Sequence, residues 1–379
     1  MKALVIGAGM MGSAMAYDLS RSPNVEKVYL ADIDRKKAAE AAKSAGTNIE
    51  PLKLDTGSHD DVIEAMKLAD VAIGATSYNH NVQLTKAAIE SGTHFCDLGG
   101  NMDVVDTQLE LDAKAKWANV LIIPNCGLAP GMACAIAGGA AKRFEKVEEI
   151  HIRVGGLPQK PVPPLNYQLV FSAEGLINEY LEPAEAIRDG NLQKLDSMTD
   201  IEMLSFPNPF EQLEAFNTSG GISTLTRMYS GVKSLDYKTI RYLGHCEKFK
   251  MLLDLGFASS EPVMVGSNLL TTREFFETLL KKKLPANGPD VVLTRVSISG
   301  MMGGKHRTLA YEMVDYYDTA ARMTSMMRTT SFPTSIIAQM IVNGTITERG
   351  VFPPERCVPL DPFIAELKKR NIVFNESLA

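Results

Sequence analysis

Three glycines near the start of the chain have the spacing of a dinucleotide-binding loop. Gly7, Gly9 and Gly12 form a GxGxxG motif that directly follows the apolar run 2–6 and precedes a helical pattern. The first glycine of such a loop permits a tight turn, the second lets the backbone approach a pyrophosphate, and the third lets the helix pack closely on the sheet. Asp32 ends the next apolar run twenty residues after Gly12, where a carboxylate can bind ribose hydroxyls. The motif therefore predicts a dinucleotide cofactor.

The residue at position 32 also bears on which dinucleotide is bound. A carboxylate there repels the 2′-phosphate of NADP, so Asp32 favours NAD. The bases Arg35, Lys36 and Lys37 leave NADP open, because they could bind that phosphate, although an exposed first helical turn explains them as well. We therefore predict NAD, with NADP as the alternative.

Further cofactor contacts are expected where the predicted strands end. Asp55 follows the third strand, near the adenine, and Ala75 and Thr76 follow the fourth, where small side chains let the chain pass the cofactor. Cys126 follows the sixth strand and is expected beside the nicotinamide as a small neutral neighbour, since no step needs a thiolate. The predicted cofactor residues are Gly7, Gly9, Met10, Met11, Gly12, Asp32, Asp55, Ala75, Thr76 and Cys126.

Residues 2–125 alternate between apolar runs and helical patterns. This alternation is typical of parallel strands that are connected by crossover helices. The predicted strands are 2–6, 27–31, 49–54, 71–74, 94–96 and 120–123, and the predicted helices are 10–20, 35–45, 60–68, 82–91 and 107–117. This part of the chain is therefore expected to form a Rossmann-type, doubly wound parallel sheet.

The pattern changes after residue 145. Residues 149–155 alternate as a strand, and 291–299 and 306–315 alternate on either side of Gly303 and Gly304, which predicts an antiparallel hairpin. Further helices are expected at 132–141, 245–255, 271–282, 335–342 and 362–370. We therefore predict an α/β protein with three parts. They are a Rossmann domain at 1–125, an inserted α+β domain with a mostly antiparallel sheet at 126–325, and a tail at 326–379 that returns to the first domain.

The composition excludes several classes of protein. The 379 residues carry 39 Lys and Arg against 45 Asp and Glu, and this net charge of −6 argues against a nucleic-acid partner. The hydrophobic fraction of 45% and the charged fraction of 22% exclude a disordered chain and a coiled coil. Five scattered cysteines without a CxxC pair indicate neither a disulfide framework nor a zinc site. We therefore predict no metal and a cytoplasmic location.

One apolar stretch raises the question of a membrane span. Residues 117–141 contain no charged residue and no histidine. Pro124, Pro130 and several glycines divide the stretch into a strand, a loop and a small-residue helix. We therefore predict a buried strand–loop–helix and no membrane partner.

Several blocks of the sequence resemble the saccharopine dehydrogenase-like superfamily. They are GATSYNHNVQLTKAAIESG at 74–92, FCDLGGN at 95–101, NCGLAPGM at 125–132, VGGLPQKPVPPLNYQLVFS at 154–172, LINEYLEPA at 176–184, KTIRYLGHCEKFKMLLDLGF at 238–257 and RGVFPPE at 349–355. Within the superfamily, the chain is most similar to the lysine 6-dehydrogenase group. It departs from the expected pattern at Leu243, where the resemblance leads us to expect proline before Gly-His.

The resemblance implies a homodimeric two-domain enzyme that oxidises an amine with NAD(P). For L-lysine, a hydride would leave the ε-carbon, and water would convert the iminium ion into allysine and ammonia. Two other reactions stay open, namely the glutamate-forming saccharopine dehydrogenase reaction and a reductive amination of the carboxynorspermidine type. The alternative outside enzymes is an NAD-binding sensor or scaffold.

Amine oxidation needs groups that accept and deliver protons. Candidates follow the fourth and fifth strands, at the carboxyl edge where open α/β sheets bind ligands. We expect Asp97 to be the base or the water-activating acid, with a cap on the turn at 99–100 as its alternative. Tyr78 resembles an active-site tyrosine of the superfamily, and a packing aromatic is its alternative. His80 is a weaker candidate.

Arg241 and His245 lie four residues apart and are predicted to reach one pocket. The Arg241 guanidinium suits a bidentate contact with a carboxylate, and a surface ion pair with the acidic segment 174–214 is its alternative. His245 is predicted to carry protons or to bind the ligand, because its ordinary pKa suits that role. Weaker candidates for binding the substrate α-ammonium or lining the cleft are Glu179, Tyr180 and Tyr167.

Overall fold

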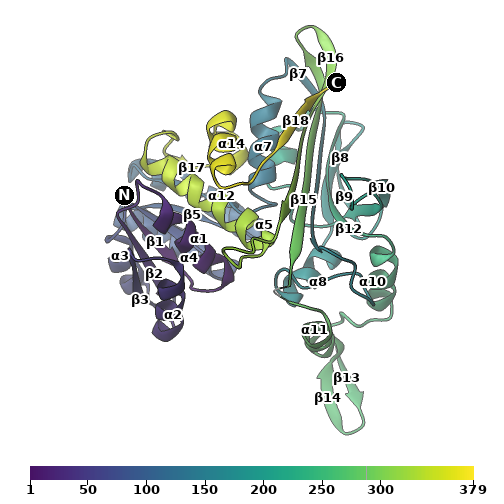
Figure 1. Cartoon of the computed structure of the whole chain (residues 1–379), viewed down its shortest axis with the longest axis horizontal. Coiled ribbons are helices and arrows are strands. Elements are labelled where there is room, and N and C mark those ends of the chain that lie inside the picture. The colour runs from purple at the N-terminus through teal and green to yellow at the C-terminus, as the bar shows by residue number, and fades with distance from the viewer. Residues whose placement is uncertain (287) are drawn as a thin grey trace.

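Two β-sheets with helices between and around them make up the computed structural model, which describes residues 1–286 and 288–379 (Figure 1). The first sheet has seven strands and the second has nine. A separate hairpin, β13 (Pro262–Val265) and β14 (Asn268–Thr271), projects from the end of the molecule that carries the second sheet (Figure 1). Within the described residues, no helix has both the length and the apolar character needed to span a membrane.

All neighbouring strands of the first sheet are parallel, as the alternation of strands and helices predicts. In spatial order they are β17 (Gly350–Val351), β6 (Leu121–Ile123), β5 (His94–Asp97), β4 (Val71–Gly74), β1 (Lys2–Ile6), β2 (Lys27–Asp32) and β3 (Ile49–Lys53). The connecting helices are α1 (Met10–Arg21), α2 (Arg35–Ala45), α3 (His59–Met66), η1 (Tyr78–His80), α4 (Asn81–Ser91), α5 (Met102–Leu109) and α6 (Asp112–Trp117). The central strand β4 is buried throughout, because helices cover both faces of the sheet. The predicted Rossmann-type fold is confirmed.

The single helix predicted at 107–117 is wrong, because the structure has α5 and α6 in its place. The first of these helices starts early, since the Asn101 side chain accepts a hydrogen bond from the Val104 N–H at 3.1 Å. The second helix begins with Asp112, whose carboxylate accepts a hydrogen bond from the Val351 N–H of β17 at 2.9 Å. That partner belongs to the distant tail, so a local pattern could not indicate where the helix would break.

The second sheet is mostly antiparallel, as predicted, with one parallel pair between β12 and β7. In spatial order its main strands are β10 (Glu202–Leu204), β11 (Leu213–Asn217), β12 (Ser234–Tyr242), β7 (Lys146–Pro158), β15 (Asp290–Met302), β16 (Lys305–Tyr316) and β18 (Asn375–Leu378). Strands β8 (Ala184–Arg188) and β9 (Asn191–Leu195) extend it from β12. The predicted hairpin at Gly303 and Gly304 is confirmed by β15 and β16.

Side chains alternate between two faces of the second sheet, as the period of a strand requires. Ile150 and Ile152 of β7, with Val296 of β15, point to the face that packs on α7 (Met132–Ala141) and the tail, which we call the inner face. His151 and Arg153 point to the opposite, outer face. The remaining helices beside this sheet are α8 (Ala173–Leu181), α9 (Leu225–Met228), α10 (His245–Asp254) and α11 (Thr272–Lys283).

The tail contributes one strand to each sheet, since β17 pairs with β6 and β18 pairs with β16. Its helices are α12 (Ser325–Val342), α13 (Pro354–Cys357) and α14 (Leu360–Lys369). Helix α12 lies between the two sheets (Figure 1). It starts earlier than the predicted 335–342, because the Thr324 side chain caps it by accepting from the Met327 N–H at 3.1 Å, and the Asp290 carboxylate accepts from the two preceding N–H groups. The tail is further tied to α1, because Arg370 forms an ion pair with the buried Asp18 at 2.6 Å.

Close packing of the tail on α7 depends on glycine. A Cβ atom at Gly138 would lie 2.2 Å from the Glu355 carbonyl oxygen, and one at Gly139 would lie 2.7 Å from the Leu360 Cβ. We expect Gly138→Ala to lower the free energy of unfolding by about 1–3 kcal/mol, because overpacking outweighs the helix propensity gained. Chemical denaturation measures the change. Gly231→Ala is the matched control, since no atom lies within 4 Å of its added Cβ. Equal stability of the two variants would contradict this packing.

Candidate functional site

The loop after β1 has the shape of a phosphate cradle. Gly7 has φ +108°, and a Cβ there would lie 2.5 Å from the Ala75 carbonyl oxygen. A Cβ at Gly12 would lie 1.8 Å from the Gly7 carbonyl oxygen, so both positions need glycine for the fold itself. A Cβ at Gly9 would meet no atom within 4 Å. The fold therefore leaves open space at Gly9, where a pyrophosphate would approach.

Helix α1 presents free N–H groups to this space. Its N-cap is Gly9, and no side chain caps it. The first turn of a helix has unpaired N–H donors and a positive dipole end, which together attract phosphate. Beside the loop, the buried Thr76 hydroxyl has no hydrogen-bond partner among residues 1–286 and 288–379. These donors fit the phosphates of a dinucleotide, and Gly9, Met10, Met11 and Thr76 stay predicted cofactor contacts.

The Asp32 carboxylate is held at the end of β2. It accepts hydrogen bonds from the Ala8 N–H at 2.8 Å, the Asp34 N–H at 3.0 Å and the Lys37 ammonium at 3.1 Å. Burial acts to raise the pKa of Asp32, but these three donors lower it overall, so the carboxylate is ionised at neutral pH. The ionised Asp32 carboxylate therefore lies where the adenosine ribose is expected to bind, and Lys37 lies beside it. Asp55 is exposed and accepts a hydrogen bond from the Gly57 N–H at 2.8 Å.

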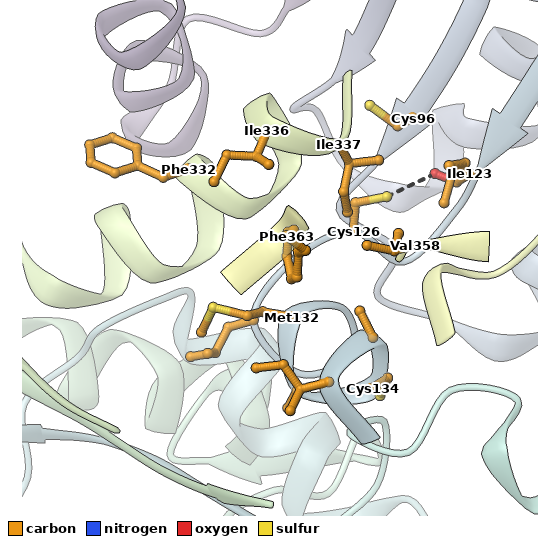
Figure 2. Close-up of a cluster of buried hydrophobic side chains, with 14 of the residues drawn as sticks. Cys96, Ile123, Cys126, Met132, Cys134, Phe332, Ile336, Ile337, Val358 and Phe363 are labelled. Atoms are coloured by element: carbon orange, nitrogen blue, oxygen red, sulfur yellow. Dashed lines mark hydrogen bonds between the residues drawn. The ribbon is translucent and has the colours of Figure 1, made fainter. Parts of the chain in front are cut away.

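The Cys126 thiol is not at the sheet edge. It is fully buried and donates a hydrogen bond to the Ile123 carbonyl oxygen at 3.2 Å. Figure 2 shows it inside a cluster that contains Cys96, Ile337 and Val358. Burial raises the pKa of Cys126 well above its usual range. The side chain has no surface for a nicotinamide, so the structure does not place this thiol among the cofactor contacts.

The Asp97 carboxylate holds two loops at the carboxyl edge of the first sheet. It accepts hydrogen bonds from the Gly99 N–H at 2.7 Å, the Asn125 N–H at 3.4 Å and the Gln108 side-chain amide at 2.7 Å. Burial raises the pKa of Asp97 to about 6, and the three donors oppose that rise. These contacts are those of the turn cap, and they connect the chain after β5 with the chain after β6.

Tyr78 and His80 lie in η1, at the same edge as Asp97. Tyr78 is half-buried and packs on Gly100, where a Cβ would lie 3.1 Å from its ring. Its hydroxyl has no hydrogen-bond partner in the part of the chain that the structure describes. The His80 Nδ1 lies 3.2 Å from the Thr56 hydroxyl, which turns the imidazole toward the chain after β3.

Arg241 lies near the end of β12 and faces the inner side of the second sheet. It is buried, at 3% exposure, and its Nε donates to the Tyr180 hydroxyl at 2.8 Å while Nη1 donates to the Ile240 carbonyl oxygen at 2.9 Å. The Tyr167 ring centroid lies 4.8 Å from its Cζ. Burial acts to lower the pKa of Arg241, but the neighbouring Tyr180, Tyr167 and Glu179 raise it overall. No carboxylate among the described residues pairs with this cation, which would make it costly to bury alone.

The acidic segment 174–214 pairs with other cations. Asp200 and Glu202 bind Lys238 at 3.0 and 3.1 Å, and Glu202 also binds Arg153. These pairs line a hollow of about 450 Å³ on the outer face of the second sheet, opposite to the face of Arg241. The alternative of a surface ion pair between Arg241 and this segment therefore does not apply.

His245 begins α10 and contacts the same tyrosine as Arg241. Its Nδ1 lies 2.8 Å from the Leu165 carbonyl oxygen and its Nε2 lies 3.1 Å from the Tyr180 hydroxyl. Burial, together with the nearby Arg241, lowers the pKa of His245 to about 3. The structure brings Arg241 and His245 into one buried cluster, in which both side chains contact the Tyr180 hydroxyl.

Glu179 and Tyr167 complete this cluster on the inner face. One carboxylate oxygen of Glu179 accepts hydrogen bonds from the Thr239 hydroxyl at 2.6 Å and the Thr218 hydroxyl at 3.1 Å. Tyr167 is fully buried, and burial raises its pKa to about 12, so its phenol is neutral. Sequence reasoning missed both threonines. The period of a strand could have indicated Thr239, two residues before Arg241, but nothing in the sequence pointed to Thr218.

The segment 218–224 connects the first sheet with this cluster. Asn125, after β6, donates a hydrogen bond to the Ser223 hydroxyl at 3.2 Å. At the other end of the segment, Thr218 binds Glu179, as described above. The Asn125 N–H in turn donates a hydrogen bond to the Asp97 carboxylate. Contacts thus connect Asp97, at the carboxyl edge of the first sheet, through Asn125 and the segment 218–224 with Glu179.

Helix α12 makes a second connection. Its Ser331 hydroxyl donates to the Met11 carbonyl oxygen at 3.0 Å, so the tail helix touches the glycine-rich loop. Near its start, Met326 packs on Gly156 of β7, where a Cβ would lie 2.5 Å from the Met326 Cε. The same methionine packs on the apolar cluster that contains Tyr167. One helix therefore contacts both the predicted cofactor loop and the surroundings of Arg241.

Two family models together match nearly the whole chain. The model described as "Saccharopine dehydrogenase NADP binding domain" matches residues 3–123, and the one described as "Saccharopine dehydrogenase C-terminal domain" matches residues 127–373. The second match alone covers more than half of the chain.

Curated proteins and solved structures give related matches. A mouse (Mus musculus) protein named "Alpha-aminoadipic semialdehyde synthase, mitochondrial" is 21% identical over 99% of this chain but only 47% of its own length, so the chain spans about half of it. A Pyricularia oryzae protein named "Saccharopine dehydrogenase [NADP(+), L-glutamate-forming]" is 23% identical over 69% of this chain and 60% of its own. The structure of apo saccharopine dehydrogenase (L-Glu forming) from Saccharomyces cerevisiae has a TM-score of 0.82 at 19% identity, covering 100% of this chain and 99% of that one.

Proposed function

This chain belongs to the saccharopine dehydrogenase family, and we propose that it oxidises a carbon–nitrogen bond of an amino acid with a nicotinamide dinucleotide as the hydride acceptor. The observation that carries the proposal is the Arg241 guanidinium, which is buried, charged and without a carboxylate partner among the described residues. A substrate carboxylate would supply the missing anion through a bidentate contact.

The surroundings of Arg241 fit the head group of an amino acid. Glu179 is near enough to raise the pKa of Arg241, and only one of its carboxylate oxygens is bound by Thr218 and Thr239. We assign its other oxygen to the substrate α-ammonium. A cation and an anion side by side would hold a zwitterion in one orientation, and the rest of the substrate would then extend toward the first sheet.

The residues divide the work of the reaction between them. The cofactor supplies the hydride acceptor when it is bound. Gly9 and the start of α1 hold its phosphates, and Arg241 and Glu179 orient the substrate. We assign proton transfer at the reacting nitrogen to Tyr78, whose hydroxyl is free to meet a ligand at the sheet edge. We assign Asp97 a positioning role, because its carboxylate holds the chain after β5 and the chain after β6 in place.

L-Lysine is the first substrate candidate, because it has one head group for one Arg–Glu pair and a second nitrogen at its far end. Oxidation would remove a hydride from the ε-carbon and a proton from the nitrogen. Water would then add to the iminium ion and release ammonia. Saccharopine is the second candidate, favoured by the names of the relatives. It would lose a hydride from the same carbon and release glutamate in place of ammonia, and it would need cations beyond Arg241 for its further carboxylates.

A panel of substrates tests the proposal. Cofactor reduction would be followed at 340 nm with lysine, saccharopine, polyamines and other amino acids, each with NAD and with NADP. Turnover of lysine alone supports the first candidate, and turnover of saccharopine but not lysine supports the second. Tight cofactor binding without turnover of any amine would contradict the proposal and favour a sensor or scaffold.

We further propose that NAD is preferred, although the family model and the Pyricularia oryzae relative are named for NADP. The ionised Asp32 supports this choice, because it would repel a 2′-phosphate. Asp32→Ser is expected to raise the ratio of kcat/KM with NADP to that with NAD about tenfold, since about 1.4 kcal/mol of repulsion would be removed. The paired variant Lys37→Ala tests the opposite case. If Lys37 binds a 2′-phosphate, Lys37→Ala will selectively lower kcat/KM with NADP, and the wild type will prefer NADP.

A homodimer and a cytoplasmic location stay predictions. All five cysteines are buried and free, which supports a reducing compartment. Sedimentation equilibrium of the full chain measures the oligomeric state, and a monomer at micromolar concentration would contradict the dimer.

A further inference from the structure

Tyr180 lies between Arg241 and His245, the two residues that the sequence predicts to bind the substrate and to carry protons. Its hydroxyl lies 2.8 Å from the Arg241 Nε and 3.1 Å from the His245 Nε2. Its ring is buried and packs edge-on against Phe216 and Phe249, with centroids 5.7 and 4.9 Å away. The tyrosine is therefore fixed by packing, and among residues 1–286 and 288–379 its hydroxyl contacts these two neighbours alone.

The direction of each hydrogen bond follows from the atoms involved. The Leu165 carbonyl oxygen can only accept, so the His245 Nδ1, 2.8 Å away, must carry the proton. The Arg241 Nε can only donate, so the Tyr180 oxygen accepts from it and sends its own hydrogen to the His245 Nε2. A protonated imidazole would leave that hydrogen without an acceptor and would place a second cation beside Arg241. The contacts thus require a neutral imidazole with its proton on Nδ1.

This arrangement fixes one side of the guanidinium and leaves the other side available. Tyr180 holds Nε, and the Ile240 carbonyl oxygen accepts from Nη1. Nη2 has no hydrogen-bond partner among the residues that the structure describes, although the side chain is buried. Two N–H groups of Nη2 and the remaining one of Nη1 therefore point in a set direction, as a carboxylate needs.

We propose that Tyr180 and His245 are positioning residues, which hold Arg241 in the orientation that binds the substrate carboxylate, and that His245 does not transfer protons in the reaction. The inference rests on the proposed function for the role of Arg241, but the hydrogen-bond relay itself rests on contacts alone. It also replaces the earlier expectation of His245 as a proton carrier with a role as a hydrogen-bond acceptor.

The first test is kinetic and uses conservative variants of the full chain. Tyr180→Phe keeps the ring and removes the hydroxyl, so we expect KM for the amino acid to rise about tenfold while kcat and the cofactor KM stay within about twofold. His245→Leu should do the same, and the double variant should be no worse than either single one. His245→Gln offers an acceptor near the position of Nε2 and should restore much of the wild-type KM.

A proton-transfer role would give a different result. In that case His245→Gln and His245→Leu would both lose kcat, and a limb of the kcat profile against pH would disappear with them. Arg241, Tyr180 and Tyr167 near the imidazole have pKa values raised above their usual range, so none of these three would supply that limb near neutral pH. Lys248 and Glu214 are the further charged residues beside it. Loss of kcat with unchanged KM would overturn the proposal.

The second test needs no substrate, so it separates failure of the relay from failure of the proposed function. In protein with ¹⁵N-labelled histidine, His245, assigned through His245→Gln, should remain neutral with its proton on Nδ1 down to pH 5. In ¹⁵N-arginine protein, the protected Arg241 Nε–H signal should shift in Tyr180→Phe. An imidazole that titrates near pH 6.5, or an Nε–H signal that Tyr180→Phe leaves unchanged, would refute the relay even if the chain oxidises amines. If the relay is intact but no amine is oxidised, only the proposed function fails.

Discussion

Arg241→Ala is expected to raise KM for the amino-acid substrate at least about 100-fold, with a smaller change in kcat. The guanidinium is buried, and its substrate partner would be desolvated with it. Removing one member of such a pair costs about 3–5 kcal/mol, and every 1.4 kcal/mol corresponds to about tenfold. Because we propose that Arg241 holds the end of the substrate that does not react, the loss should appear mainly in KM. Steady-state kinetics with the amine that the wild type oxidises measures the effect.

Two controls separate recognition from folding. Arg241→Lys keeps the charge but loses the planar fork, so it should recover only part of the affinity. Arg295→Ala removes an arginine of the same sheet from the outer face, where Arg295 pairs with Glu312, and should leave KM unchanged. If Arg241→Ala and Arg295→Ala behave alike, Arg241 does not bind the substrate.

Gly9→Ala is expected to weaken cofactor binding without weakening the fold. No atom lies within 4 Å of a Cβ at this position, so the apo protein accommodates the methyl group. The methyl group would instead occupy the space through which the pyrophosphate approaches the backbone. Overpacking of about 1–3 kcal/mol corresponds to a rise in the cofactor dissociation constant of roughly 5- to 150-fold. Isothermal titration with NAD and with NADP measures it.

Gly7→Ala provides the contrast to Gly9→Ala. A Cβ at Gly7 would lie 2.5 Å from a carbonyl oxygen and would occupy a backbone with φ +108°, so this variant should lose stability as well as binding. Thermal unfolding without cofactor distinguishes the two variants. A Gly9→Ala protein that binds the dinucleotide as tightly as the wild type would show that the ligand lies elsewhere.

The fold of the first 125 residues could be predicted because its signals are local. A buried parallel strand, a glycine turn and a helix follow one another from Lys2 to Arg21, and each of them can be recognised from neighbouring residues. The same reasoning failed for α5 and α6, where the boundary depends on a contact between Asp112 and the tail strand β17. It also placed the start of α12 too late, because it missed the local cap Thr324; the other partner of the first turn, Asp290, lies 35 residues earlier in the chain.

The site divides in the same way. The positions of the glycines and Asp32 follow from one motif, so their geometry could be predicted. Cys126 could not be placed, since its position after a strand says nothing of the direction in which the thiol points, and it points into the core. The spacing of Arg241 and His245 correctly brought them together, but their chemistry depends on Tyr180, which comes from another helix 61 residues before Arg241.

The most direct test of the central claim follows the hydride itself. Lysine and saccharopine would be prepared with deuterium on the carbon that becomes the aldehyde of allysine, and the reduced nicotinamide would be examined by mass spectrometry. We predict that one of the two transfers deuterium to the nicotinamide ring, with a matching release of ammonia or glutamate. Reduced cofactor without deuterium from either compound, or no reduction with either one, would contradict the account.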